Sequence, residues 1–271
     1  MEIDDIKDII YRQNATVNFT VENQTSINVA LRDKNNNTID VNVINSTVEL
    51  NDLEVGEYTL NITNVEDENT TESSASKTFS VVKANSTVDV KNTDHVYGDI
   101  INIEITSENA TNVTYVLTDS EGNIIKNATL GASGNITDLV LDAGVYTLNV
   151  TTITDDAYQN VTATFNITVK KADASILTVS DQGTKTIGEE ITIPVMVVNE
   201  AINPSGTLVF KIGNETVEEV NFTNSVYYFK YTPDKIGDIT IDILFNSTNF
   251  AAADAVLKIT VSGIETNITI E

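Results

Sequence analysis

The sequence contains no cysteine and no tryptophan, only three prolines and a single histidine. Without cysteine, the chain has no disulfide, no zinc–thiolate site and no thiol nucleophile. The lack of disulfides does not fix the compartment, because stable domains form without them on either side of a membrane. With 271 residues, of which 41% are hydrophobic, the chain suffices for one large domain or for two to three ordinary ones.

Basic residues are also scarce, since 15 Lys and Arg side chains face 40 Asp and Glu side chains. The resulting formal net charge of −25 repels nucleic acid and anionic lipid. We therefore expect no nucleic-acid partner. The acidic surface is typical of a highly solvated protein, and calcium is the one cofactor that it leaves open.

No apolar run approaches the ~18 residues of a membrane helix, so we expect no membrane span in this sequence. The first residues, M-E-I-D-D-I-K, are acidic, whereas a signal peptide begins with a basic stretch followed by an apolar one. An exported form of the chain is therefore expected to be an internal piece of a longer precursor.

An internal repeat sets the domain organisation. The string L-E-V-G-E-Y-T-L-N-I-T at 53–63 recurs as L-D-A-G-V-Y-T-L-N-V-T at 141–151. The spacing, Gly144 minus Gly56, is 88 residues, and a degraded third copy follows at Gly237, 93 residues after Gly144. Solenoid repeats of 20–50 residues are much shorter, so this period predicts separate domains. The predicted units are 1–83, 84–171 and 172–263, with 264–271 as a linker or the start of a fourth repeat.

Nearly every segment alternates polar and apolar residues, as half-exposed strands do. Ile191, Ile193 and Val195, for example, share one face of their segment. Each repeat also carries a polar tip rich in Asn, Gly and Asp, which predicts a hairpin turn. Short strands separated by such turns predict an all-β fold with three tandem Ig-like β-sandwich domains in an elongated array.

The first segment departs from this alternation. Ile3, Ile6, Ile9 and Ile10 fit helical spacing better than strand spacing. Two interpretations remain, a short helical cap or an irregular first strand, and alignment with the other repeats favours the strand.

The repeated string contains the pattern Asp-x-Gly-x-Tyr in its second copy, at 142–146. This is the pattern of a tyrosine corner, in which a Tyr at the start of strand F hydrogen-bonds the backbone across the turn. We expect this structural role for Tyr58 and Tyr146, with the glycine allowing a sharp bend. Leu148 lies where antibody domains have a cysteine, and the third repeat has Ile239 in place of the tyrosine.

Asn-x-Thr triplets, the acceptor pattern for N-glycosylation, occur nineteen times, where random placement would give roughly six. An exposed strand face produces alternating polar residues in any case, but Asn is a poor strand former, so its excess needs another cause. We predict glycosylation in the native host for at least several sites. The candidates are Asn14, Asn18, Asn23, Asn36, Asn45, Asn61, Asn69, Asn85, Asn109, Asn112, Asn127, Asn135, Asn149, Asn160, Asn166, Asn214, Asn221, Asn246 and Asn267.

The sequence contains few residues that could carry catalytic chemistry. The single histidine, His95, is expected in a loop before a strand, exposed and inert, and no nucleophile elbow, P-loop, zinc-protease or dinucleotide motif occurs. The turn at 119–123 resembles a calcium loop but lacks the bidentate Glu, and Asp155 and Asp156 are expected in another turn. Lys230 could form a Lys–Asn isopeptide bond only in an apolar core with an acid. We predict no enzyme, no catalytic or cofactor-binding residue and no metal ligand.

The strings at 95–105, 142–150 and 163–172 together resemble the Ig-like repeats of large adhesin-like cell-surface proteins. They are most similar to those of methanogenic archaea, with bacterial Ig-like repeat domains as wider relatives. The resemblance implies an acidic extracellular glycoprotein that acts in cell adhesion at the cell surface. Its expected partner is an unknown surface ligand, a protein or carbohydrate of another cell.

Three functional interpretations follow. The repeats are a stalk, forming a rod of order 100 Å if three sandwiches lie in line. Alternatively, the third repeat binds a ligand through its aromatic run Y-Y-F-K-Y at 227–231, which an exposed aromatic patch would favour and buried rings would disfavour. As a third alternative, residues 265–270 complete a neighbouring copy by strand addition, giving a filament or surface-layer subunit.

Overall fold

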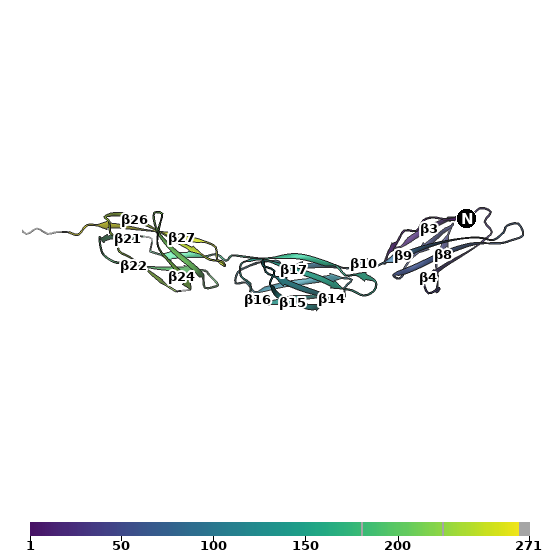
Figure 1. Cartoon of the computed structure of the whole chain (residues 1–271), viewed down its shortest axis with the longest axis horizontal. Coiled ribbons are helices and arrows are strands. Elements are labelled where there is room, and N and C mark those ends of the chain that lie inside the picture. The colour runs from purple at the N-terminus through teal and green to yellow at the C-terminus, as the bar shows by residue number, and fades with distance from the viewer. Residues whose placement is uncertain (180, 224, 266–271) are drawn as a thin grey trace, which may run out of the picture.

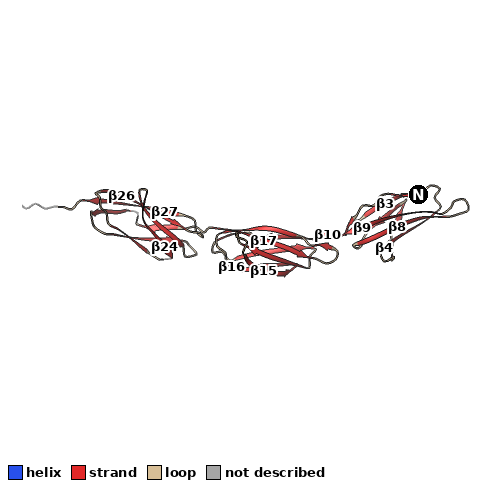
Figure 2. Ribbon diagram, viewed as in Figure 1, coloured by secondary structure: helices blue, strands red, loops and turns tan. Residues whose placement is uncertain are grey.

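A computed structural model describes residues 1–179, 181–223 and 225–265. Three β-sandwich domains follow one another in an elongated row, with the N-terminus at one end (Figure 1). The described residues form strands and loops, as the secondary-structure colouring shows (Figure 2). The predicted all-β fold with tandem Ig-like sandwiches is therefore confirmed. Within the described residues, no helix is long and apolar enough to cross a membrane.

The first domain packs a five-stranded sheet against a four-stranded one. In sheet order, the five strands are β2 (Ile9–Ile10), β9 (Ser73–Val82), β8 (Gly56–Val65), β4 (Ser26–Asp33) and β5 (Thr38–Ile39). The four strands are β1 (Glu2–Ile3), β3 (Ala15–Thr20), β7 (Thr47–Leu50) and β6 (Asn42–Ile44).

The first segment is an interrupted strand, and the helical interpretation is wrong. Ile3 pairs with Phe19 in one sheet, whereas Ile9 pairs with Val81 in the other. Both isoleucines are buried. The spacing looked helical because the chain changes sheets between them, so that each isoleucine enters the core from a different side.

The second domain repeats this plan. Its five-stranded sheet has the order β12 (Asp94–Val96), β19 (Thr162–Lys170), β17 (Gly144–Ile153), β14 (Asn112–Thr118) and β15 (Ile124–Gly131). Its three-stranded sheet has the order β11 (Thr87–Lys91), β13 (Ile101–Glu108) and β16 (Ser133–Leu139), and a short pair joins β10 (Ala84–Asn85) to β18 (Tyr158–Gln159).

The third domain has the same two layers. The five strands are β21 (Asp181–Thr186), β27 (Ala253–Ser262), β26 (Gly237–Asn246), β23 (Ser205–Ile212) and β24 (Glu215–Thr223). The three strands are β20 (Ser175–Thr178), β22 (Ile191–Val198) and β25 (Tyr227–Tyr231). In all three domains the first strand of the large sheet lies parallel to the last strand of the domain. The other pairs are antiparallel, except for the short parallel pair of β10 and β18 in the second domain.

Each domain has its own hydrophobic core, because alternate residues of both sheets point inward. Leu60 and Leu148 are fully buried in the first two cores, so aliphatic packing occupies the place of a disulfide. The third core is aromatic, with the rings of Phe210 and Phe229 stacked at 4.1 Å between centroids. The alternation in the sequence thus identified the inward faces correctly.

Candidate functional site

The junction between the first and second domains is built from two aromatic rings and an arginine. Tyr11 and Tyr158 meet edge to face, with ring centroids 5.5 Å apart and planes at 88°. The Arg12 guanidinium lies 5.7 Å from the centroid of the Tyr11 ring and 5.8 Å from that of Tyr158. Such ring pairs and cation–π contacts stabilise by roughly 0.5–1.5 kcal/mol each, so they restrict bending between the domains.

The junction between the second and third domains repeats the aromatic contact. Tyr97 meets Phe250 with centroids 5.5 Å apart and planes at 75°, and Tyr97 packs against the cores of both domains. The Asn249 side chain bridges the domains: its Oδ1 accepts from the Ala143 N–H at 2.9 Å, and its Nδ2 donates to Asp142 Oδ1 at 2.8 Å. Lys171 Nζ also donates to Ser247 O at 2.6 Å, so three side-chain hydrogen bonds and a ring contact hold this junction.

The two junctions use equivalent positions. The N–H of Tyr11 donates to Val82 O, and the N–H of Tyr97 donates to Lys170 O, so each tyrosine follows the short parallel strand at the end of its domain. The third domain has Ile187 at this position, with its N–H on Ser262 O. The partner ring comes each time from the segment before the last strand of the next domain, with Tyr158 in β18 and Phe250 in the loop before β27. The role of these residues was not predicted from the sequence, although an aromatic residue in an otherwise polar segment is a usable signal.

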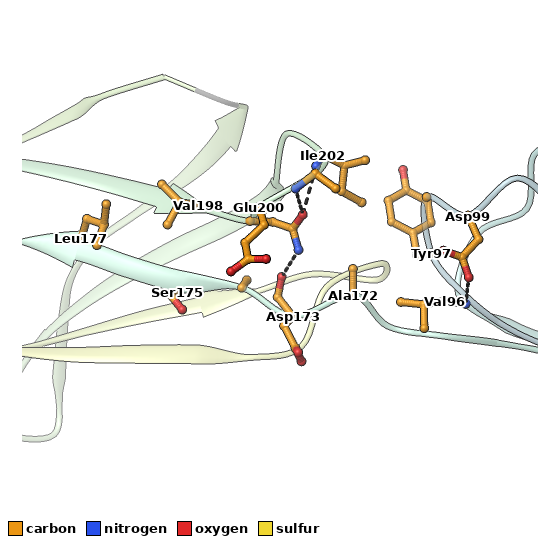
Figure 3. A pocket seen from close by; sticks show the side chains of 14 residues that line it. Val96, Tyr97, Asp99, Ala172, Asp173, Ser175, Leu177, Val198, Glu200 and Ile202 are labelled. Carbon is orange, nitrogen blue, oxygen red and sulfur yellow. Dashed lines mark hydrogen bonds between the residues drawn. The ribbon is translucent and has the colours of Figure 1, made fainter.

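A pocket of about 890 Å³ lies at the second junction. Figure 3 shows Val96 and Tyr97 of the second domain on one side and Ile202 of the third domain near them. Gly98 makes the close approach tolerable, since a Cβ there would lie 2.8 Å from Ile202 Cδ1 and φ is +94°. The Asn199 side chain accepts from the Ile202 N–H and donates to Asp173 O, which holds the loop in place.

The tyrosine corners have the geometry described for Ig-type sandwiches. Tyr58 Oη donates to Glu54 O at 2.8 Å, and Tyr146 Oη donates to Asp142 O at 2.9 Å. Burial raises the pKa of both phenols, so they stay neutral hydrogen-bond donors. The expectation that Gly56 and Gly144 are needed for a sharp bend is wrong. Neither glycine has a positive φ, and an added Cβ would lie at an ordinary contact distance of 3.9 Å from the tyrosine ring.

The candidate catalytic and metal groups are dispersed. His95 lies within strand β12 and is half-buried, not exposed in a loop as expected, and its Nε2 contacts Asn92 O at 2.8 Å. Asp119 Oδ1 accepts the N–H groups of Glu121 and Asn123, so this loop is an ordinary polar turn. No group of three or more His, Cys, Asp or Glu side chains that could hold a metal occurs in the described part of the chain.

The isopeptide hypothesis fails at Lys230. Its side chain is exposed, and its Nζ pairs with Glu190 Oε1 at 3.0 Å. An isopeptide bond requires a lysine held in an apolar core. Lys230 therefore belongs to the solvated outer face of β25.

The acceptor asparagines lie on the surface. Asn267 falls outside the described residues, as do residues 266–270 of the predicted extra strand. Of the other 18 acceptors, 16 are exposed, and Asn61 and Asn149 are half-buried. Thr164 Oγ1 donates to Asn149 Oδ1 at 2.7 Å, a contact that does not involve the amide nitrogen to which a glycan would attach.

The aromatic run of the third domain is split between core and surface. Phe229 is buried, Tyr227 and Tyr231 are half-buried, and Tyr228 is 59% exposed. The run is therefore largely a core element, with one ring available to a partner.

No protein-family model matches the sequence, and a search of curated proteins finds no match. Among solved structures, the fibronectin(III)-like modules of CbhA from Clostridium thermocellum share 15% identity, covering 68% of this chain and all of that one, with a TM-score of 0.32. A mutated three-Ig fragment of titin shares 13% identity over 96% of this chain and 95% of its own, with a TM-score of 0.32. Escherichia coli α2-macroglobulin shares 9% identity with a TM-score of 0.29; the match covers 97% of this chain but only 23% of that protein. At such TM-scores, the Ig-like architecture rests on the strand topology itself.

Proposed function

We propose that the chain is a non-catalytic part of an extracellular, adhesin-like cell-surface protein, in which the Ig-like repeats act as a stiff stalk. The observation that carries this proposal is the recurring junction, in which Tyr11 meets Tyr158 and Tyr97 meets Phe250. A stalk that projects a binding tip has to resist folding back on itself. Adjacent domains in one chain move freely unless such contacts hold them.

Three further features support an exterior location and a passive role. Acceptor asparagines lie on the surface of all three domains, as a glycoprotein requires. The acidic surface favours solubility and disfavours nucleic acid or anionic membranes. The lone His95 has a backbone carbonyl as its neighbour, whereas a catalytic histidine needs an activated partner. Adhesion, the cell surface and an archaeal relationship enter this proposal through the resemblance of the repeats.

Small-angle X-ray scattering of the whole chain tests the stalk. We expect a rod with a maximum dimension of order 100 Å and no change with protein concentration. The double variant Tyr97→Ala with Asn249→Ala removes the ring contact and the Asn249 hydrogen bonds of the second junction, so its scattering curve should show bending. Ile124→Ala, at an exposed site on β15, is the matched control. A compact wild-type particle would contradict the proposal, and polymers that grow with concentration would support the filament alternative.

A further inference from the structure

The outer face of the three-stranded sheet in the third domain is apolar except at one end, where Lys230 pairs with Thr192 across the strands and with the Glu190 carboxylate. Leu177 pairs with Met196 across β20 and β22, and Pro194 pairs with Tyr228 across β22 and β25. Leu177 is 55% exposed and Tyr228 is 59% exposed. Their neighbours along each strand lie in the buried core, so these four side chains point away from it. Contiguous exposed apolar residues of this kind mark an interaction site, whereas single ones do not.

The equivalent face of the second domain is polar. There Lys91 pairs with Glu104, which pairs with Asn135, and Asp89 pairs with Thr106. Both domains bury the same sides of these strands, so the fold does not require an apolar outer face. The apolar outer face of the third domain is therefore better explained by a binding partner than by the needs of the fold.

The acceptor triplets avoid this apolar face. In the first two domains the smaller sheet carries acceptors, Asn18 on β3 and Asn135 on β16. In the third domain the described acceptors Asn214, Asn221 and Asn246 lie on or beside strands of the larger sheet. The apolar face therefore stays accessible even if the acceptor asparagines on the other faces carry glycans.

The junction pocket continues from this face and is acidic. Leu177 and Val198 line the pocket and also belong to the outer side of the sheet. The charged residues that line the pocket are Asp99, Asp173 and Glu200, and no described lining residue is basic (Figure 3). The surface therefore offers apolar contacts beside an unbalanced negative charge, which selects a partner of opposite charge.

We propose that this surface, formed by the outer face of β20, β22 and β25 and by the junction pocket, binds a basic polypeptide segment with apolar side chains. Aliphatic or aromatic anchors would contact Leu177, Met196 and Tyr228, while Lys or Arg side chains would meet the carboxylates of Asp99 and Glu200. A second copy of this chain is disfavoured by its net charge of −25. The surface spans three strands and a domain junction, which suits an extended segment better than a small cation. A spacer role does not depend on this binding.

Fluorescence anisotropy with a labelled, end-capped peptide of sequence Lys-Leu-Lys-Phe-Lys-Leu-Lys tests the proposal on the whole chain at about 150 mM salt. We expect saturable binding that the double variant Leu177→Ser with Tyr228→Ser weakens about ten-fold or more. Glu200→Gln should weaken it about three-fold, because one attraction is lost. The matched controls are Val140→Ser, an apolar residue that is 93% exposed on the second domain, and Glu121→Gln at the tip of a hairpin. Both controls should leave the affinity unchanged.

Peptide variants separate specific docking from general charge attraction. Replacing the peptide's Leu and Phe by Ser should abolish binding, and so should replacing its Lys by Glu. Equal binding of the Ser peptide, or equal losses in the control proteins, would overturn the proposal. Inert peptides together with a neutral oligosaccharide whose binding depends on Tyr228 would also overturn it and assign the face to carbohydrate. A dimer that the double variant abolishes would overturn it in favour of a second copy.

Discussion

At the residue scale, single tyrosine side chains fix the turns and the domain junctions. Tyr58 and Tyr146 each tie a turn to their own strand through one phenol hydrogen bond. The repeated string, with Gly-x-Tyr in both copies and Asp-x-Gly-x-Tyr in the second, was enough to place these residues, because the corner is a local motif. The role of its glycine could not be predicted, since that depends on backbone angles and on the space beside the ring. The junction tyrosines, Tyr11 and Tyr97, were missed because their partners are more than a hundred residues away.

Tyr146→Phe removes the corner hydrogen bond and keeps the ring. We expect the free energy of unfolding to fall by about 0.5–1.5 kcal/mol, the net worth of one hydrogen bond. Tyr115→Phe is the control, because Tyr115 is equally buried and its hydroxyl has no hydrogen-bond partner among the described residues. Urea denaturation of both variants gives the comparison. Equal losses would show that the corner bond adds nothing beyond ring packing.

Alkaline pH should weaken the third domain through Tyr227. Burial and the hydrogen bond from its phenol to Glu218 raise the pKa of Tyr227 from 10.0 to about 12. Because the folded pKa is the higher one, this stabilisation is complete below pH 10 and is lost as the pH rises from about 10 to about 12. Guanidinium denaturation at several pH values should show a shallower decline for Tyr227→Phe. Parallel declines would exclude this phenol as the cause.

At the scale of strands and hairpins, polar–apolar alternation predicted the inward faces well. Ile191, Ile193 and Val195 are buried as expected, since a strand exposes alternate residues regardless of its partner. The alternation could not show which strands pair. The parallel pairing of each domain's first and last strands depends on contacts across about 75 residues, as between Ile9 and Val81. In the first segment, where the chain moves from one sheet to the other, the spacing alone left a helix and a strand open, and the strand favoured by alignment with the other repeats is confirmed.

Gly206 on β23 has no room for a side chain. A Cβ at this position would lie 2.3 Å from the Asn246 carbonyl oxygen and 2.7 Å from the Phe245 ring. Gly206→Ala should therefore destabilise the protein by about 1–3 kcal/mol, measured by denaturant unfolding. Gly131→Ala on β15 is the matched control, because its Cβ would be 3.8 Å from Ser133 O. Similar stability of the two variants would show that β23 and β26 can separate at little cost.

At the scale of the whole molecule, the 88-residue period predicted the number of domains but not how they are joined. The ring pairs and the Asn249 bridge are visible only in three dimensions. The stalk hypothesis therefore depends on inter-domain contacts that could not be predicted from the amino-acid composition. The bare apolar face of the third domain was equally hidden, because Tyr228 stands beside buried aromatic residues in the sequence.

Glycopeptide mapping of protein from its native host should find glycans on exposed acceptors such as Asn127 and Asn135. Occupancy should be lower at Asn61 and Asn149, which are half-buried in the middle of their sheets. The transferase needs access to the amide nitrogen, so exposure should order the sites. Complete absence of glycans from native material would contradict the extracellular glycoprotein hypothesis.

The most direct test of the stiff stalk is the spread of distances across the second junction. The chain has no cysteine, so Asn102→Cys and Asp254→Cys on opposite sides of the junction can be spin-labelled selectively. Double electron–electron resonance should give one narrow distance distribution in the wild-type background. Adding Tyr97→Ala and Asn249→Ala should broaden it. A wild-type distribution as broad as that of the junction variant would contradict the account.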